Sequence, residues 1–377
     1  MVFRRHGICS ATATMRKIGF WKALVGLGFL MIGPGRAEEE RQFIQPTPEH
    51  PLIVKVVVLA MFEVGADTGD KPGEYQFWVE RRKLDHIIPL PAAYHDVRAD
   101  DKGVIATVTG MGTAHAAASV TALGLDPRFD FSRAYWVIAG IAGVNPNRAS
   151  IGSAIWADYV LDGDLAHEID AREIPKNWST GLIPIESALP FPKPRPQSDG
   201  EVYQLNGGLV RWAYNLTRDV PLQDTETMKK NRIRYKGVQA ALAGPKVLKG
   251  ATLSSSTYWH GKILNQWASE WVNYWTDGKG AYFTTAMEDS GTLQALSDLA
   301  KAGRADLNRV LILRTASNFD SQPPGVTAAE DLAEEHRGDY SAYIPSLEAA
   351  FNVGNRVVSE LADHWDQYAT QRPDEGD

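Results

Sequence analysis

The chain has 377 residues, of which 44% are hydrophobic and 23% charged, and its formal net charge is −7. This composition is typical of a globular protein with one large core or two modest ones, and it excludes extended disorder away from the termini. An acidic chain is also a poor partner for nucleic acid polymers.

The charge and hydropathy pattern of residues 1–37 predicts a secretory signal peptide. Arg16, Lys17 and Lys22 precede an apolar run over 23–33, and Ala37 stands before three glutamates. The run is shorter than the roughly 20 residues of a membrane span, although an uncleaved anchor is the alternative. No later segment is apolar enough to cross a bilayer, so we expect a soluble exported protein without a membrane span after cleavage, in the periplasm or secreted.

Cleavage after Ala37 changes both the charge and the cysteine content. Subtracting the six basic residues of the leader from 39 leaves 33 against 46 acidic residues, a net charge of −13. Cys9 is the single cysteine and lies in the leader, so the mature chain has no disulfide or thiol chemistry.

Strands and helices alternate after a polar linker over 38–50, and we predict one domain over 51–377. A Pro-rich loop or insertion over 173–200 interrupts this alternation. Strands are predicted at 54–59, 103–109, 134–139, 151–161, 246–253, 281–286 and 310–313. Helices are predicted at 114–125, 208–216, 225–230, 261–276, 287–302 and 343–368. The expected fold class is α/β, a single three-layer domain with a central mixed, mostly parallel sheet.

Two glycine turns end neighbouring predicted strands. Gly110, Met111 and Gly112 join a strand to a helix, and Gly140 begins a second turn on the next strand. Bare backbone lets a ligand approach closely, and ligands of parallel sheets bind beyond the carboxyl ends of strands. Tight helix–strand packing is the alternative explanation for both turns.

Two later strand ends carry polar groups. Met287 and Glu288 begin a helix, where the carboxylate can accept hydrogen bonds from vicinal hydroxyls or complement the helix dipole. Asn318 and Asp320 follow the last strand and can donate to a departing purine, although such residues also favour turns.

Aromatic residues follow the strand over 246–253. Tyr258 or Trp259 offers a face for a flat heterocycle, with core packing as the alternative, and His260 is a candidate polar contact. The histidines do not fall at metal-ligand spacing, and no phosphate-binding loop or dinucleotide motif is present, so we predict no metal and no cofactor.

In this order the motifs resemble the purine nucleoside permease family, which is similar in fold to the nucleoside phosphorylase and nucleosidase superfamily. The resemblance covers the chain from Leu52 to the final helix. It depends on the stretches 58–63, 110–112, 139–144, 151–157, 258–261, 287–288 and 314–318.

The resemblance implies a purine nucleoside as ligand and a role for several residues. Met287 and Glu288 match the pair that holds the ribose. Asn318 matches the position of the base-protonating group, and Asp320 is a second candidate there. Glu63 lies close to the water-activating glutamate of hydrolytic relatives, one residue out of register.

Phosphate is a less favoured second ligand. Phosphorylases of the superfamily have an arginine and a serine where this chain has Ile138 and Ile141, so phosphorolysis would need another arginine, such as Arg314 or Arg148. We therefore expect cleavage of the N-glycosidic bond by hydrolysis. The alternatives are a nucleoside-binding protein that takes part in transport without catalysis and an interaction protein on a retired enzyme fold. The resemblance also makes a homo-oligomer a candidate state.

Overall fold

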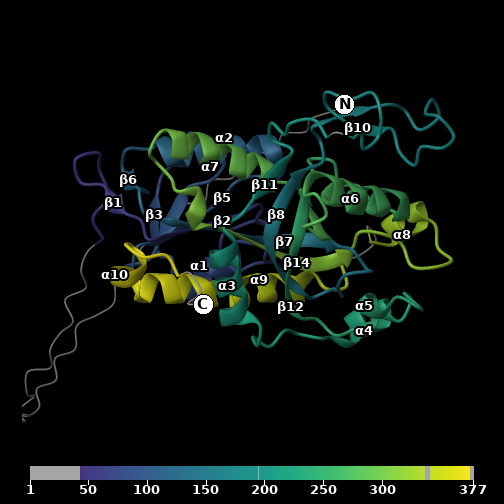
Figure 1. Cartoon of the computed structure of the whole chain (residues 1–377). Coiled ribbons are helices and arrows are strands. Elements are labelled where there is room, and N and C mark those ends of the chain that lie inside the picture. Colours follow the sequence, from purple (N-terminus) through teal and green to yellow (C-terminus); the bar gives the residue numbers. More distant parts are fainter. Residues whose placement is uncertain (1–42, 194, 336–339, 374–377) are drawn as a thin grey trace, which may run out of the picture. The chain divides into compact units, whose positions relative to one another are not determined.

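The computed structural model describes residues 43–193, 195–335 and 340–373 (Figure 1). The predicted signal peptide and residues 38–42 of the predicted linker lie outside the described residues. Residues 43–50 form no helix or strand, and Phe43 stacks on His86 with 4.0 Å between ring centroids. None of the described helices is long and apolar enough to span a bilayer.

The main sheet is mixed and has ten strands among the described residues. Their bounds are β2 (Val56–Ala60), β3 (His86–Ile88), β4 (Val97–Ala99), β5 (Val104–Val108), β7 (Tyr135–Val144), β8 (Ala154–Asp162), β11 (Val202–Gln204), β12 (Val247–Ser254), β13 (Tyr282–Ala286) and β14 (Val310–Phe319). Two short pairs stand apart from it: β1 (Leu52–Ile53) with β6 (Phe129–Asp130), and β9 (Ala166–Glu168) with β10 (Leu182–Pro184).

Five strands of this sheet close into a barrel. The ring runs β7–β14–β8–β12–β13 and returns to β7. Pairing is parallel along β5–β2–β7–β14 and along β8–β12–β13, but antiparallel at β13–β7, at β14–β8 and at the edge strands β3, β4 and β11. The mixed α/β sheet is therefore confirmed. Parallel strand pairs are less dominant than predicted. The five strands that close into a barrel also do not form the open three-layer sheet that was predicted.

Helices pack on both sides of the open half of the sheet (Figure 1). Their bounds are α1 (Gln76–Arg82), α2 (Thr113–Leu125), α3 (Gly207–Thr217), α4 (Glu226–Arg232), α5 (Gln239–Leu242), α6 (Lys262–Trp275), α7 (Asp289–Lys301), α8 (Ala328–Glu335), α9 (Tyr343–Asp363) and α10 (Trp365–Tyr368). A β-carbon on Gly124 of α2 would overlap Leu299 of α7, and one on Gly291 would overlap the Thr113 carbonyl, so both glycines allow these two helices to pack closely. On the opposite side α9 lies against β7 and β14.

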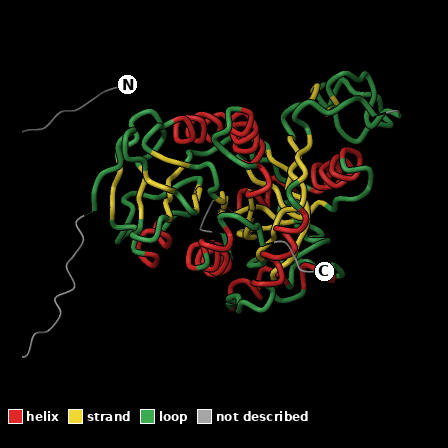
Figure 2. Tube along the Cα trace, turned by 60° about the vertical axis from the view of Figure 1, so that its left-hand side comes forward, coloured by secondary structure: helices red, strands yellow, loops and turns green. Residues whose placement is uncertain are grey.

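The Pro-rich segment packs beside α6. Figure 2 shows this part of the chain as loops with a short hairpin, which β9 and β10 form. The ring of Phe191 lies 5.4 Å from Tyr274 and 6.2 Å from Trp271, between centroids. Trp267, Trp271 and Trp275 are buried along one face of α6 at the predicted helical spacing, and each such side chain stabilises the fold by roughly 1.5–3 kcal/mol.

Candidate functional site

A small cavity lies where several strand ends meet. Its walls come from the ends of β7, β12, β13 and β14 and are Gly143, Ser255, Thr257, Tyr258, Trp259, Thr285, Ala286, Met287, Asn318 and Asp320. The cavity has a volume of about 20 Å³, which is room for one water molecule. The structure thus brings together Met287, Asn318, Asp320, Tyr258 and Trp259 from the predicted set.

Asn318 is held with its amide toward Tyr258. Its Nδ2 donates to the Tyr258 hydroxyl at 2.9 Å, and its Oδ1 accepts from the Ser317 hydroxyl at 2.9 Å. The register of β14 against β7 shifts between Ala316 and Asn318, and this bulge re-aims the side chain. Tyr258 is 43% exposed at the mouth of the cavity, whereas Trp259 is buried beside Trp267.

Asp320 lies deeper, on the barrel side of the cavity. Its carboxylate accepts from Asn265 Nδ2 at 2.9 Å and from the Tyr282 hydroxyl at 2.5 Å. Burial raises the pKa of Asp320 to about 6, although these hydrogen bonds oppose the shift. Asp320 can therefore carry a proton at mildly acidic pH, whereas Asn318 can donate only its amide hydrogens.

Glu288 joins the first glycine turn to the cavity. Its Oε1 accepts from the Gly112 amide at 3.1 Å, and its Oε2 accepts from Met287 N and from Arg314 Nη2, both at 3.2 Å. Burial raises the pKa of Glu288, and the Arg314 guanidinium opposes that shift. Gly110 and Gly112 have φ values of 84° and 90°, which glycine adopts without strain, and Met111 between them is exposed.

Arg314 is enclosed by carboxyl groups. Its Nε bonds both oxygens of Asp289, at 3.1 and 3.0 Å, and its Nη2 bonds Asp289 Oδ1 at 2.6 Å. Both side chains are almost wholly buried, and Asp289 is the first residue of α7. Arg314, one of the two candidate phosphate ligands, is thus occupied by acidic side chains. The other candidate, Arg148, is exposed.

Glu74 is a buried carboxyl group that sequence reasoning missed. It is 4% exposed and precedes α1, and its oxygens accept from Met61 N at 2.7 Å and from Ile141 N at 2.6 Å. Burial raises the pKa of Glu74 to about 8, with Arg314 lowering it and Glu288 raising it further. Gly140 lies within β7 and not in the predicted turn, and a β-carbon there would lie 2.5 Å from Glu74 Oε1, so this glycine makes room for the carboxyl group. The Pro-Gly pair at 72–73 is a turn signal that could have drawn attention to it.

The Glu63 carboxylate bonds the backbone of a loop and does not line the cavity, where it was expected. Its carboxylate accepts from the backbone N–H groups of Val64, Gly73, Tyr75 and Gln76, the last of which begins α1. These bonds fasten the loop over 64–75 and the start of α1. Glu63 therefore anchors this loop, whereas Glu74 bonds the backbone at the end of β2 and in β7.

Replacing Glu63 with alanine should lower the free energy of unfolding by about 1–3 kcal/mol, because several backbone donors lose their acceptor. Catalysis by the remaining folded protein should be unchanged. Urea unfolding followed by tryptophan fluorescence would measure the loss. Glu80→Ala is the matched control, since Glu80 accepts one backbone hydrogen bond, from Gly69 at 2.9 Å. A Glu63 variant that keeps its stability but loses activity would return the catalytic role to Glu63.

His260 does not line the cavity. It pairs with Asp331 of α8, and one ligand atom from each of His260, Asp331 and Glu335 lie within 4.8 Å of one another. The search for metal ligands at short spacing in the sequence did not find this group, because Asp331 and Glu335 follow His260 by about seventy residues. These three residues could hold a metal ion.

The family model and the curated relatives that match this chain have the same description, purine nucleoside permease. The model of the purine nucleoside permease family matches residues 53–373. A purine nucleoside permease of Candida albicans is 31% identical over 321 residues, 83% of this chain and 76% of that protein. A probable purine nucleoside permease of Schizosaccharomyces pombe is 30% identical over 291 residues, 74% of this chain and 82% of that protein. Among solved structures, the futalosine hydrolase of Helicobacter pylori strain 26695 has a TM-score of 0.49 at 13% identity, over 81% of this chain and 98% of that one.

Proposed function

The chain belongs to the purine nucleoside permease family, and from that premise we propose that it binds a purine nucleoside beneath Tyr258 and hydrolyses the N-glycosidic bond. The observation that carries this proposal is the position of Glu74. A carboxyl group with a pKa of about 8 lies at the end of β2 and accepts from Ile141 N of β7, in the same buried charge cluster as Glu288. Raised pKa values of this kind are typical of catalytic acids and bases.

The ribose would lie at the Glu288 end of the site. Vicinal hydroxyls can replace the Met287 and Gly112 amides as donors to this carboxylate, and charge-assisted hydrogen bonds of this type are strong. Burial raises the pKa of Glu288, and the Arg314 guanidinium opposes that rise and so favours the charged form that accepts them. Met287 lines the cavity and would pack against the sugar.

The purine would lie at the Asn318 end. A purine leaves as an anion unless N7 is protonated or hydrogen-bonded, and Asn318 Nδ2 can donate such a bond in place of its present bond to Tyr258. The exposed ring of Tyr258 would stack on the base. Asp320 is the second candidate donor, through a proton rather than an amide hydrogen.

Glu74 would activate the attacking water. In its ionised form Glu74, whose oxygens now accept from Met61 N and Ile141 N, can take a proton from a water molecule that enters beside it. Because Ile138 and Ile141 cannot bind phosphate and Arg314 is occupied by Asp289, hydrolysis is favoured over phosphorolysis. A cavity of about 20 Å³ does not hold a nucleoside, so binding requires the segment 255–260 to shift outward.

A direct test is to incubate purified protein with inosine or adenosine, with and without phosphate, and to measure free base by chromatography. We expect base release that does not depend on phosphate. Saturable nucleoside binding without any free base would instead support the second candidate, a binding protein in nucleoside transport, which the names of the relatives favour. No binding and no release would remove both. Export to the periplasm or medium is part of the proposal, and leader cleavage after Ala37 can be checked by mass spectrometry.

A further inference from the structure

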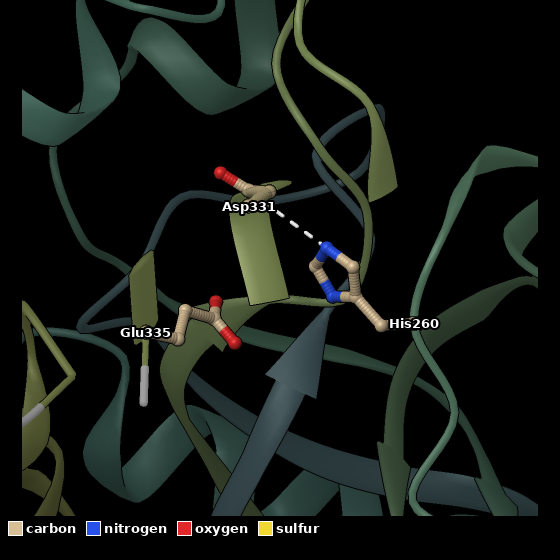
Figure 3. Close-up of side chains that lie close together, drawn as sticks. All are labelled: His260, Asp331 and Glu335. Carbon is tan, nitrogen blue, oxygen red and sulfur yellow. Dashed lines mark hydrogen bonds and ion pairs between the residues drawn. The ribbon is translucent and has the colours of Figure 1, made fainter. Parts of the chain in front are cut away.

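A second group of side chains lies behind Tyr258, outside the nucleoside cavity. His260 belongs to the loop between β12 and α6, and Asp331 and Glu335 lie four residues apart on α8, on one face of that helix. One ligand atom from each of the three lies within 4.8 Å of the others. Figure 3 shows both carboxyl groups beside the imidazole ring.

The ligand atoms are well enclosed. The His260 and Asp331 side chains are 2% and 5% exposed, and His260 Nε2 lies 3.1 Å from Asp331 Oδ2. Two ligands that are each about 2.0–2.1 Å from a tetrahedral zinc ion are about 3.3 Å apart, so this pair needs little movement. Nε2, which faces Asp331, is the nitrogen that this pair offers to an ion. Among the described residues, Nδ1 is buried without a hydrogen-bond partner.

Carboxyl groups outnumber the arginine beside them, since Asp331, Glu334 and Glu335 lie around one guanidinium. Arg234 Nη2 bonds Asp331 Oδ1 at 3.2 Å and Glu334 Oε2 at 3.0 Å, so one guanidinium serves two carboxylates. Glu335 has a long contact to a neutral partner, the Tyr258 hydroxyl, at 3.5 Å. A cavity of about 170 Å³ adjoins Asp331, Glu335 and Asn318 and has room for water ligands. A cation would complete this arrangement.

We propose that His260, Asp331 and Glu335 bind one divalent transition-metal ion, with water filling the remaining positions. One imidazole and two carboxylates suit Zn²⁺ or Mn²⁺ better than Ca²⁺ or Mg²⁺, which prefer oxygen ligands alone. The ion would link His260, just before α6, to α8. The proposal does not depend on nucleoside cleavage.

The test is calorimetric titration of the chelator-treated full chain with ZnCl₂, MnCl₂ and CaCl₂ at neutral pH. We expect one Zn²⁺ or Mn²⁺ per chain and much weaker binding of Ca²⁺. His260→Ala and Glu335→Gln should each weaken Zn²⁺ binding at least about tenfold, as expected for loss of a ligand. His86→Ala serves as the control and should bind as the parent does, because it removes a histidine that pairs with Asp101, at 2.7 Å, away from the proposed ligands.

Circular dichroism of each variant separates loss of the site from loss of the fold. Because Glu335→Gln preserves side-chain shape, it carries the test if His260→Ala does not fold. Absence of stoichiometric binding by the parent would overturn the proposal. Equal Zn²⁺ affinity of the parent and Glu335→Gln would do the same, since the ion would then lie elsewhere on the chain. Those results would indicate that a protonated His260, and not a metal ion, balances the charge of the two carboxylates.

Discussion

Replacing Arg314 with methionine should lower the free energy of unfolding by about 3–5 kcal/mol, one of the two largest effects that we expect from a single substitution. The guanidinium is buried and is bonded to both oxygens of Asp289 and to Glu288. Its positive charge also lowers the pKa of Glu74. Methionine fills a similar volume but leaves these carboxyl groups without a counter-charge in a medium that disfavours the ionised form. Urea unfolding at neutral pH would measure the loss.

The control for this prediction is Arg81→Met on the surface. Arg81 makes two hydrogen bonds to Glu348, at 2.5 and 2.6 Å, but its side chain is 35% exposed. Solvent screening should limit that loss to about 1 kcal/mol or less. Adding Asp289→Asn to Arg314→Met should recover part of the stability, because one uncompensated charge is removed. If Arg314→Met costs no more than Arg81→Met, the buried cluster does not have the electrostatic role that we assign to it.

Much of the fold could be predicted because its helices and central strands have clear periodicity. The helix over 261–276 and the strand over 54–59 were both predicted, and α6 and β2 lie there. β7 and β14 are longer than predicted, extending to Val144 and Phe319. The glycines and polar residues in these strands were interpreted as strand ends, but they continue the ladder, in which Gly143 pairs with Asn318. Barrel closure was not predicted, because it depends on pairings between strands that are distant in the sequence.

The candidate site was predicted in part for a related reason. Met287 and Glu288 follow the end of β13, and Asn318 lies in the last part of β14, where local pattern and chemistry coincide. Glu74 stands in a polar loop, and nothing in its neighbours shows that the loop folds back over the ends of β2 and β7. Glu63 has the expected position in the sequence but binds that same loop. Local sequence therefore identified the positions along the strands but not which carboxyl group becomes buried.

Glu74→Gln should reduce hydrolysis of a purine nucleoside by about 10²- to 10⁴-fold, the usual contribution of a general base. Glutamine keeps the acceptor oxygen for Met61 N or Ile141 N but cannot take a proton from water. Nucleoside affinity, measured by equilibrium binding, should change little, because Glu288 and Asn318 are intact. Initial rates of base release would give kcat and KM separately, and the loss should be in kcat.

The pH dependence of both rate and stability tests the same assignment. Because the pKa of Glu74 is raised from 4.5 to about 8, its basic form increases as pH rises, and kcat/KM should climb toward pH 8 and then level off. Stability should change in the opposite direction. Between these two pKa values the folded chain retains a proton that the unfolded chain has lost, so the free energy of unfolding falls as pH rises.

Burial also raises the pKa of Asp320 and of Glu335, so the parent and Glu74→Gln must be compared at each pH. The difference between them isolates Glu74, and the variant should lose the rising limb of the rate profile and part of the stability slope. A parent rate that falls through this range would mean that Glu74 acts as an acid, and the water-activating group would have to be sought elsewhere in the site.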